Sequence, residues 1–261
     1  EENVMTSIPK TVAGTRTPFL ERIEGGGAEV TIDERLVALT DPPGAAAEQY
    51  RMLLHRLRHA RSLRGAAQGG AVIAVTSALR QEGTSLTAAN LALTAARAGD
   101  SRVALVDCDL RRGTQAALFG MGARMGLSEL LQGKCEIGEA LGRFHEGQMA
   151  VIAAGKSPVE PAALLSSPRF LAALQTLRSL FDEIVLDVPP ALATADASIV
   201  AHRSDGVVMV VRAEATPREQ VASAVRILAG APVWGVVLNG VDPSRVPAPL
   251  PVVKGALTAG K

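Results

Sequence analysis

The sequence contains few aromatic residues and few cysteines, and each shortage excludes a class of protein. Aromatic residues make up 3% of the chain and hydrophobic residues 48%, so any core must be built from Ala, Val, Leu and Ile. That composition favours parallel strands covered by helices over an aromatic-rich β-sandwich. The two cysteines, Cys108 and Cys135, form no C-x-x-C pair, which argues against a disulfide framework, a zinc site or a redox pair.

An excess of one charge and long apolar runs are also missing. The formal net charge is +1, which argues against a strongly basic nucleic-acid binder. No apolar run approaches the ~18 residues that a membrane-spanning helix needs. The first ten residues, EENVMTSIPK, lack the apolar core of a signal peptide. We therefore expect a soluble, cytoplasmic protein without a nucleic-acid partner.

Composition divides the chain into three segments. Residues 1–43 are rich in Gly, Pro, Thr and charge, which predicts a flexible N-terminal arm with a short strand at Glu29–Ile32. Residues 44–243 are predicted to form one nucleotide-binding domain that begins with a helix over 45–64. Residues 244–261 are predicted to form an irregular, proline-containing tail.

Within the predicted domain, short apolar runs alternate with helical stretches. The runs consist mainly of Val, Ile, Leu and Ala without polar alternation, as is typical of strands buried on both faces. This order predicts an α/β fold of the P-loop NTPase type, with a doubly wound, mostly parallel sheet, helices on both faces and ligands at the carboxyl ends of the strands. The expected strands are 71–77, 102–107, 150–155, 183–188, 206–211 and 233–239, and the expected helices lie near 85–99, 161–181, 194–201 and 216–230.

The run AVIAVTSALRQEGTSL places a strand, a loop and a helix in direct succession, as a phosphate-binding loop requires. Ala78 stands first in the pattern G-x-x-x-x-G-K-[ST], and Gly83 and Ser85 match its second glycine and its hydroxyl. Thr84 occupies the place of the lysine that reaches the β- and γ-phosphates. Taken alone, this pattern favours an ordinary strand–turn–helix junction with a capping Thr or Ser.

Carboxylates stand at the ends of two further predicted strands. Asp107 and Asp109 follow VALV, and strand alternation points both to one side. Asp187 ends EIVLD and precedes two prolines, which is the form of a Walker B strand whose carboxylate holds Mg²⁺ or its water. Each acidic end also suits a helix N-cap. Because these ends lie beside the loop in one parallel sheet, we favour a metal-phosphate site.

The chain resembles the bacterial tyrosine kinases of capsule and exopolysaccharide synthesis (BY-kinases), because its phosphate loop and its two acidic strand ends follow one another in the order of that family. BY-kinases belong to the MinD/ParA-like P-loop ATPases. The resemblance runs from about residue 38 to 243. It implies a tyrosine-protein kinase fold with a site for ATP or ADP and Mg²⁺. It is carried by VALTDPPGAAAEQYRMLLHRLR, SALRQEGTSLTAANLAL, ALVDCDLRRGTQAALFG, GLSELLQGK, PAALLSSPRFLAAL, FDEIVLDVPPALATADA, DGVVMVVRAEATPRE and GVVLNGVD.

The resemblance implies a role for each matching residue. Gly83 and Ser85 match the Walker A loop, with Ser85 as a Mg²⁺ ligand. Asp107 and Asp109 match the second acidic motif, which positions the metal and the attacking hydroxyl, and Asp187 matches Walker B. The implied catalytic residues are therefore Asp107, Asp109 and Asp187, and the implied metal ligands are Ser85, Asp107 and Asp187.

Two residues at later strand ends are implied to lie near the base of the nucleotide. Asn239 ends GVVLN and matches the position that commonly contacts adenine in this superfamily. Arg212 is a further candidate for binding near the base, by position only.

The sequence departs from the family at the loop and in its tyrosines. The loop reads R-Q-E-G-T-S where the family reads like P-G-E-G-K-S. The lysine makes a charge-assisted contact worth roughly 1.5–3 kcal/mol for binding. Gln81 adds a side chain where the backbone is expected to need a positive φ. The family's C-terminal tyrosine cluster is missing from the sequence, whose single tyrosine, Tyr50, falls within a predicted helix.

The helix over 45–64 carries part of the family's E-x-x-R-x-x-R interface motif. Glu48 and Arg51 match it, and Leu54 replaces its last arginine, which is compatible with weakened homo-oligomer formation. The resemblance also implies a membrane-anchored polysaccharide co-polymerase or activator that recruits the chain to the inner face of the membrane. The basic residues of this helix fit either a solvated face or an interface with such a partner; they are Arg51, Arg56, Arg58, Arg61 and Arg64.

Three hypotheses of different classes follow, and whether the chain is an enzyme stays open. The first is a BY-kinase-like protein with weakened or lost phosphoryl transfer that regulates exopolysaccharide or capsule polymerisation and export. The second is an active tyrosine kinase in which Arg80, Arg111 or Arg112 approaches the phosphates in place of the lysine. The third is a MinD/ParA-like positioning ATPase, which we disfavour because its signature lysine would fall at Leu79. We rank the first ahead of the second.

Overall fold

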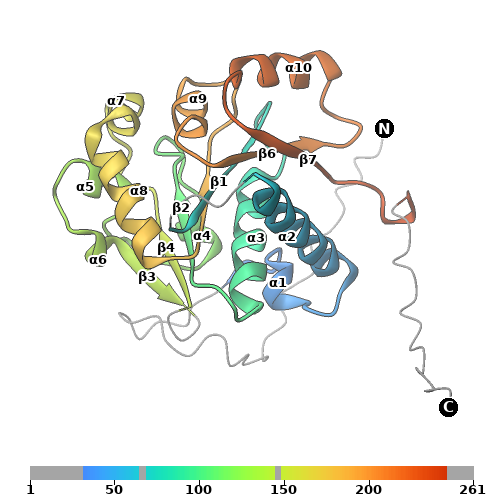
Figure 1. Cartoon of the computed structure of the whole chain (residues 1–261), viewed down its shortest axis with the longest axis horizontal. Helices are drawn as coiled ribbons and strands as arrows, with labels where there is room; N and C mark the ends of the chain where they lie inside the picture. The colour runs from blue at the N-terminus through green and yellow to red at the C-terminus, as the bar shows by residue number, and fades with distance from the viewer. Residues whose placement is uncertain (1–31, 65–68, 145–147, 246–261) are drawn as a thin grey trace, which may run out of the picture.

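A single mixed sheet forms the centre of the computed structural model, which describes residues 32–64, 69–144 and 148–245 (Figure 1). The strand order is β3-β4-β2-β5-β1-β6-β7. All neighbouring strands run parallel except β3 and β4, which pair antiparallel at one edge. The strands are β1 (Ala71–Ser77), β2 (Val103–Asp107), β3 (Leu141–Phe144), β4 (Met149–Ile152), β5 (Glu183–Asp187), β6 (Gly206–Arg212) and β7 (Val233–Asn239).

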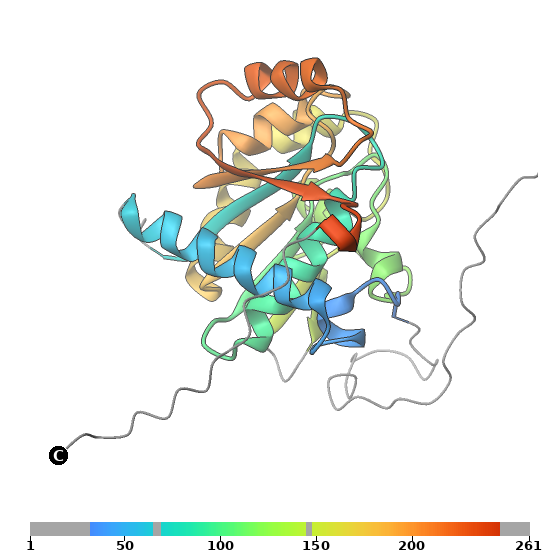
Figure 2. The same ribbon diagram turned by 90° about the vertical axis from the view of Figure 1, so that its right-hand side faces the viewer.

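Helices cover both faces of this sheet, so the predicted α/β fold of the P-loop NTPase type is confirmed. In both views α2 lies along α3 on one face, and α10 lies over β6 and β7 (Figures 1 and 2). The helices are α1 (Val37–Thr40), α2 (Ala45–Leu63), α3 (Thr84–Arg97), α4 (Gln115–Leu118), α5 (Leu127–Leu131), α6 (Ile137–Ala140), α7 (Pro161–Ser166), α8 (Pro168–Leu180), α9 (Asp196–Ala201) and α10 (Arg218–Ile227), followed by a 3-10 turn at Pro243–Arg245.

The uniformly apolar strands are explained by two hydrophobic clusters, one on each face. Along β1, Val72 and Ala74 belong to the cluster that includes α8 and α9. Ile73 and Val75 belong to the cluster that includes α2 and α3. Alternate side chains of a strand point to opposite faces of the sheet, and in β1 the side chains on both faces are buried from solvent. Every residue of β1, β2 and β5 is buried.

The structure adds elements that the sequence patterns did not predict. The run predicted as a strand at 150–155 ends at Ile152, and Leu141–Phe144 pairs with it antiparallel as β3. The helix expected over 161–181 is two helices, because Ser167 adopts an extended ψ of 155° before Pro168. A residue that precedes proline is disfavoured in the α region, so this break has a local cause.

The packed structure begins before the predicted domain boundary at residue 44. In α1, Ala38 and Leu39 are buried with the preceding Leu36 in the α2–α3 cluster. The Ala38 amide donates to Asn90 Oδ1 on α3 at 3.0 Å. Of the strand predicted at Glu29–Ile32, only Ile32 is described, and it is not in a strand; residues 29–31 lie outside the described residues, as do residues 246–261 of the predicted tail. Across the described ranges, none of the helices combines the length and apolar character needed to cross a membrane.

Candidate functional site

The predicted phosphate loop connects the end of β1 to the start of α3 at the carboxyl edge of the sheet. Gly83 is the residue before α3 and has φ +89°, in the left-handed region that glycine adopts without strain. Gln81 also has a positive φ, +62°, which confirms the expectation that this position needs one. A side chain there costs energy that a glycine would not, because Cβ approaches the following carbonyl. The loop therefore keeps a P-loop backbone without the sequence best suited to it.

Thr84, which stands in place of the lysine, is the first residue of α3. Ser85 follows it, and both are partly exposed at the helix N-terminus. The first N–H groups of a helix have no acceptors within the helix, so this end is suited to an anion. The helix end therefore offers backbone donors to phosphate, but residue 84 adds no positive charge.

Asp107 and Asp187 are brought together by the strand register. They end neighbouring parallel strands and are Cα partners in the β2–β5 ladder. Both side chains are buried, with 0% and 1% exposure. Burial and the charge of Asp187 raise the pKa of Asp107 well above its usual value. Burial also raises the pKa of Asp187 to about 6, although hydrogen bonds from Gln115 and Ser85 oppose the shift.

Gln115 is a site residue that the sequence reasoning missed. Its Nε2 donates to Asp187 Oδ2 at 2.7 Å and to the Ser85 carbonyl at 3.1 Å, so it ties β5 to the start of α3. Its own amide and that of Thr114 donate to Asp107 Oδ2 at 2.9 and 2.8 Å. Gln115 Oε1 is buried and has no partner among the described residues. No local sequence pattern predicts the role of Gln115, because its partners are distant in sequence.

The donor set at this place fits Mg²⁺. Two buried carboxylates and the Ser85 hydroxyl supply oxygen atoms, which Mg²⁺ prefers, and Mg²⁺ commonly keeps waters and phosphate oxygens as further ligands. Over residues 32–64, 69–144 and 148–245, no group of three or more His, Cys, Asp or Glu side chains could hold a metal. The structure brings Ser85, Asp107 and Asp187 together, and their role as Mg²⁺ ligands stays a prediction.

Asp109 and the neighbouring arginines lie nearer to solvent. Asp109 is partly exposed, and its Oδ1 accepts from the backbone amides of Arg111 and Arg112. Arg111 Nε donates at 2.8 Å to Asp196, whose side chain is fully buried at the start of α9. Arg111 is therefore already engaged, whereas Arg80 and Arg112 are exposed and hold no ion pair with any described residue.

Arg212 and Asn239 lie against the backbone of the loop. Asn239 Nδ2 donates to the Glu82 carbonyl at 2.8 Å. Arg212 Nη1 donates to the Gln81 carbonyl at 3.3 Å. The two residues are Cα partners at the ends of β6 and β7. The structure thus places both beside the phosphate loop, and their contact with a base stays a prediction.

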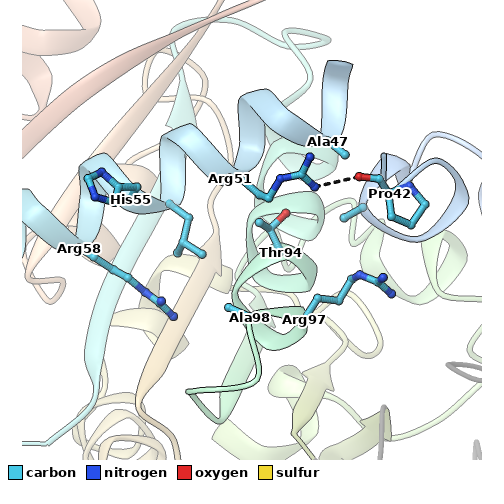
Figure 3. A pocket seen from close by; sticks show the side chains of 10 residues that line it. Pro42, Ala47, Arg51, His55, Arg58, Thr94, Arg97 and Ala98 are labelled. Carbon is cyan, nitrogen blue, oxygen red and sulfur yellow. Dashed lines mark hydrogen bonds between the residues drawn. The ribbon is translucent and has the colours of Figure 1, made fainter. Parts of the chain in front are cut away.

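The residues of the interface motif on α2 already have partners within the chain. Arg51 Nε donates to Glu48 Oε2 at 2.6 Å. Figure 3 shows the second bond, in which Arg51 Nη1 donates to the Pro42 carbonyl at 2.8 Å. Leu54, at the third motif position, is buried in the core. A cavity of about 380 Å³ lies between α2 and the C-terminal half of α3; its lining includes Arg51, His55, Arg58, Thr94 and Arg97.

The basic run of α2 is only partly a solvated face. Arg58 donates to Glu183 at 2.7 Å and to Asp100 at 2.9 Å, which holds α2 to the amino ends of β2 and β5. The guanidinium of Arg64 lies 5.7 Å from the ring centre of Trp234, a cation–π arrangement. Arg51 and Arg61 also donate to backbone carbonyls outside α2, those of Pro42 and Gly69. Four of these five arginines therefore have structural contacts within the chain.

Tyr50 is partly buried on α2. Burial raises the pKa of its hydroxyl, and hydrogen bonds with Thr87 and Asn90 of α3 oppose the shift. The hydroxyl is thus directed into the α2–α3 contact.

Comparison with known proteins agrees with this geometry. No family model matches the chain. The tyrosine-protein kinase YwqD of Bacillus subtilis is 33% identical over 211 residues, which cover 80% of this chain and 87% of YwqD. The chain belongs to the bacterial tyrosine kinases. The tyrosine-protein kinase Etk of Escherichia coli is 30% identical over 207 residues, or 78% of this chain, but these span only 28% of Etk.

Solved structures place the fold in the same group. The kinase domain of E. coli Etk superimposes with a TM-score of 0.75 at 29% identity and covers 87% of this chain and 85% of that domain. The cell-division ATPase MinD of Pyrococcus furiosus shares the fold alone, with a TM-score of 0.55 at 24% identity over 65% of this chain and 71% of MinD. The fold is thus that of a bacterial tyrosine-kinase domain, and MinD shares it.

Proposed function

We propose that this chain is a BY-kinase-like regulator of exopolysaccharide or capsule polymerisation and export whose phosphoryl transfer is weakened or lost. It binds ATP or ADP with Mg²⁺ at the carboxyl edge of the sheet. Thr84 at the start of α3 carries the proposal, because a neutral side chain stands where the phosphates would meet a lysine. The positive φ of Gln81 adds a second departure in the same loop.

The residues around Thr84 support a site that can bind a nucleotide but is poorly equipped for phosphoryl transfer. Ser85, Asp107 and Asp187 would hold Mg²⁺, which supplies positive charge to the phosphates when it is bound. Gln115 orients Asp187 through its 2.7 Å hydrogen bond. Asp109, at the open side of this pair, is the carboxylate best exposed to take a proton from an attacking hydroxyl. Without the lysine, the charge that develops on the transferred phosphoryl group lacks one fixed cation.

The second-ranked alternative is an active tyrosine kinase in which an arginine takes the place of the lysine. Arg80 lies on the loop itself and Arg112 follows the second acidic motif, and both are exposed. Arg111 is a poorer candidate, because its movement would leave the buried Asp196 without its ion pair. The MinD/ParA-like positioning ATPase is not favoured, because Leu79 stands where that group has its signature lysine.

We propose two partners. A membrane-anchored polysaccharide co-polymerase or activator would recruit the chain to the inner face of the membrane. A second copy of the chain would bind through the Glu48–Arg51 face of α2. Because Glu48 and Arg51 already pair with each other and Leu54 is buried, such an assembly is expected to be weak.

ATP turnover tests the functional proposal. The purified chain is incubated with ATP and Mg²⁺ beside a Ser85→Ala/Asp107→Ala double variant, and released phosphate and phosphotyrosine are measured. The proposal predicts turnover close to that of the double variant, together with nucleotide binding that the double variant loses. Turnover well above the double variant would reject it in favour of the active kinase.

A further inference from the structure

The carboxylate of Glu82 lies beneath the phosphate loop and is held from two sides. The side chain is 2% exposed. Its Oε2 accepts the Leu79 amide at 2.8 Å, within the loop. Its Oε1 accepts the hydroxyl of Thr216, in the connection between β6 and α10. One buried carboxylate thus links the start of the loop to a segment more than 130 residues further along the chain.

The carbonyl groups of the loop are held from the same direction. Arg212 donates to the Gln81 carbonyl, and Asn239 donates to the Glu82 carbonyl. In a trans peptide the N–H points opposite to the C=O. Fixing these two carbonyls toward β6 and β7 therefore directs the amides of Glu82 and Gly83 to the opposite side, away from those strands.

Gly83 fits closely against this arrangement. A Cβ built on Gly83 would overlap the side-chain nitrogen of Asn239. Its φ of +89° independently disfavours any other residue. Asn239 can approach the Glu82 carbonyl only because residue 83 has no side chain.

We propose that Glu82, Arg212 and Asn239 are positioning residues that hold the phosphate loop in its binding conformation. Backbone N–H groups held in this way then carry phosphate binding at a site whose lysine is replaced. This inference rests on the proposed function only in that the loop binds the phosphates of a nucleotide. It goes further by giving Arg212 and Asn239 a role at the loop, beside the predicted contact with the base, and by assigning a role to Glu82.

The test compares Glu82→Gln with Glu183→Gln. Glu183 is a matched control, because it is also a buried carboxylate with a hydrogen-bonded partner, Arg58, but it begins β5 at the opposite edge of the sheet. Amide hydrogen exchange is followed at Leu79, and binding of tripolyphosphate and of MgATP is measured by calorimetry. The binding arm is repeated with Thr84→Lys present, so that weak affinity does not hide a change.

We expect Glu82→Gln to speed exchange of the Leu79 amide about tenfold and to weaken tripolyphosphate binding by a similar factor, because a neutral amide oxygen replaces the charged acceptor of the Leu79 hydrogen bond. Glu183→Gln should change neither quantity. Asn239→Ala, which keeps Glu82 intact, should weaken tripolyphosphate binding without changing exchange at Leu79.

Unchanged exchange at Leu79 in Glu82→Gln would overturn the inference, as would faster exchange with unchanged tripolyphosphate affinity. If tripolyphosphate binds neither the wild-type chain nor Thr84→Lys, the loop binds no phosphate and the inference also fails. High ATP turnover by the wild-type chain, in contrast, would reject the proposed function and leave this inference standing.

Discussion

Asp107 and Asp187 stand directly opposite each other at the carboxyl ends of β2 and β5, and both are buried. Two neighbouring carboxylates in a dry environment oppose each other's ionisation. The structure lowers this cost with hydrogen bonds from Thr114 and Gln115, but within residues 32–64, 69–144 and 148–245 no Lys or Arg side chain forms an ion pair with either carboxylate. The pair therefore favours either a proton or a bound cation.

This relationship predicts how stability depends on pH. The pKa of Asp187 is about 6 in the folded chain, against a usual value of 3.8. Between these values the folded chain keeps a proton that the unfolded chain has released, so this contribution to stability is present below about pH 4 and lost as the pH rises through 6. A shift of about two units corresponds to about 3 kcal/mol.

Asp187→Asn should therefore be more stable than the wild-type chain at pH 7 without Mg²⁺, by up to about 3 kcal/mol, and nearly equal to it at pH 4. Urea unfolding at a series of pH values in a chelator measures the difference. Asp182→Asn is an opposite-sign control, because Arg102 lowers the pKa of Asp182 and the stability it adds is lost as the pH falls. A gap between Asp187→Asn and wild type that does not widen with pH would contradict the burial argument.

Gln81→Gly should stabilise the chain by up to about 1 kcal/mol. The left-handed conformation costs an ordinary residue roughly 1–2 kcal/mol, and the added freedom of glycine in the unfolded chain offsets part of the gain. Gln220→Gly, at an exposed position in α10, should instead destabilise by about 1 kcal/mol. Thermal unfolding of both variants checks the signs, and a loss of stability in Gln81→Gly would show that its φ of +62° carries no strain.

The arginines near the phosphate loop should separate into two kinds. Arg111→Met should destabilise the chain by about 1–3 kcal/mol, because it leaves the buried Asp196 without its partner. Arg80→Met and Arg112→Met should change neither stability nor nucleotide affinity appreciably. Calorimetric titration with MgATP decides the matter: a tenfold loss of affinity in either exposed variant would support a relocated cation.

Tyr50 should be a poor phosphate acceptor in the native chain. Burial against Thr87 and Asn90 of α3 raises the pKa of its hydroxyl, and phosphorylation would have to pull it out of the α2–α3 contact. After incubation with ATP, Mg²⁺ and an active BY-kinase, mass spectrometry should find Tyr50 modified only after the chain has been unfolded. Stoichiometric modification of the folded chain would contradict this expectation.

The sequence predicted the features that depend on local pattern. The apolar runs identified β1, β2, β5, β6 and β7, and the loop pattern predicted the positive φ at Gln81. The sequence missed contacts between distant segments. Gln115 meets Asp187 across 72 positions, and Glu82 meets Thr216 across 134. Strand and helix periodicity says nothing about such pairs, because they form only once the sheet has brought the strand ends together.

For Arg212, the sequence predicted the position but not the contacts. Its place at the end of β6 was predicted, and so was its proximity to the nucleotide site. Which atoms it contacts depends on the fold of the loop, 131 positions earlier, and the structure directs its guanidinium to the Gln81 carbonyl.

Nucleotide binding by the wild-type chain and by Thr84→Lys, each with and without Mg²⁺, tests the central claim most directly. We expect the site to be otherwise intact, with the missing charge as its main defect. Thr84→Lys should then bind MgATP at least about tenfold more tightly, as a charge-assisted contact is worth, and should gain phosphoryl transfer. Equal affinity in the two chains, with efficient turnover by the wild type, would contradict it.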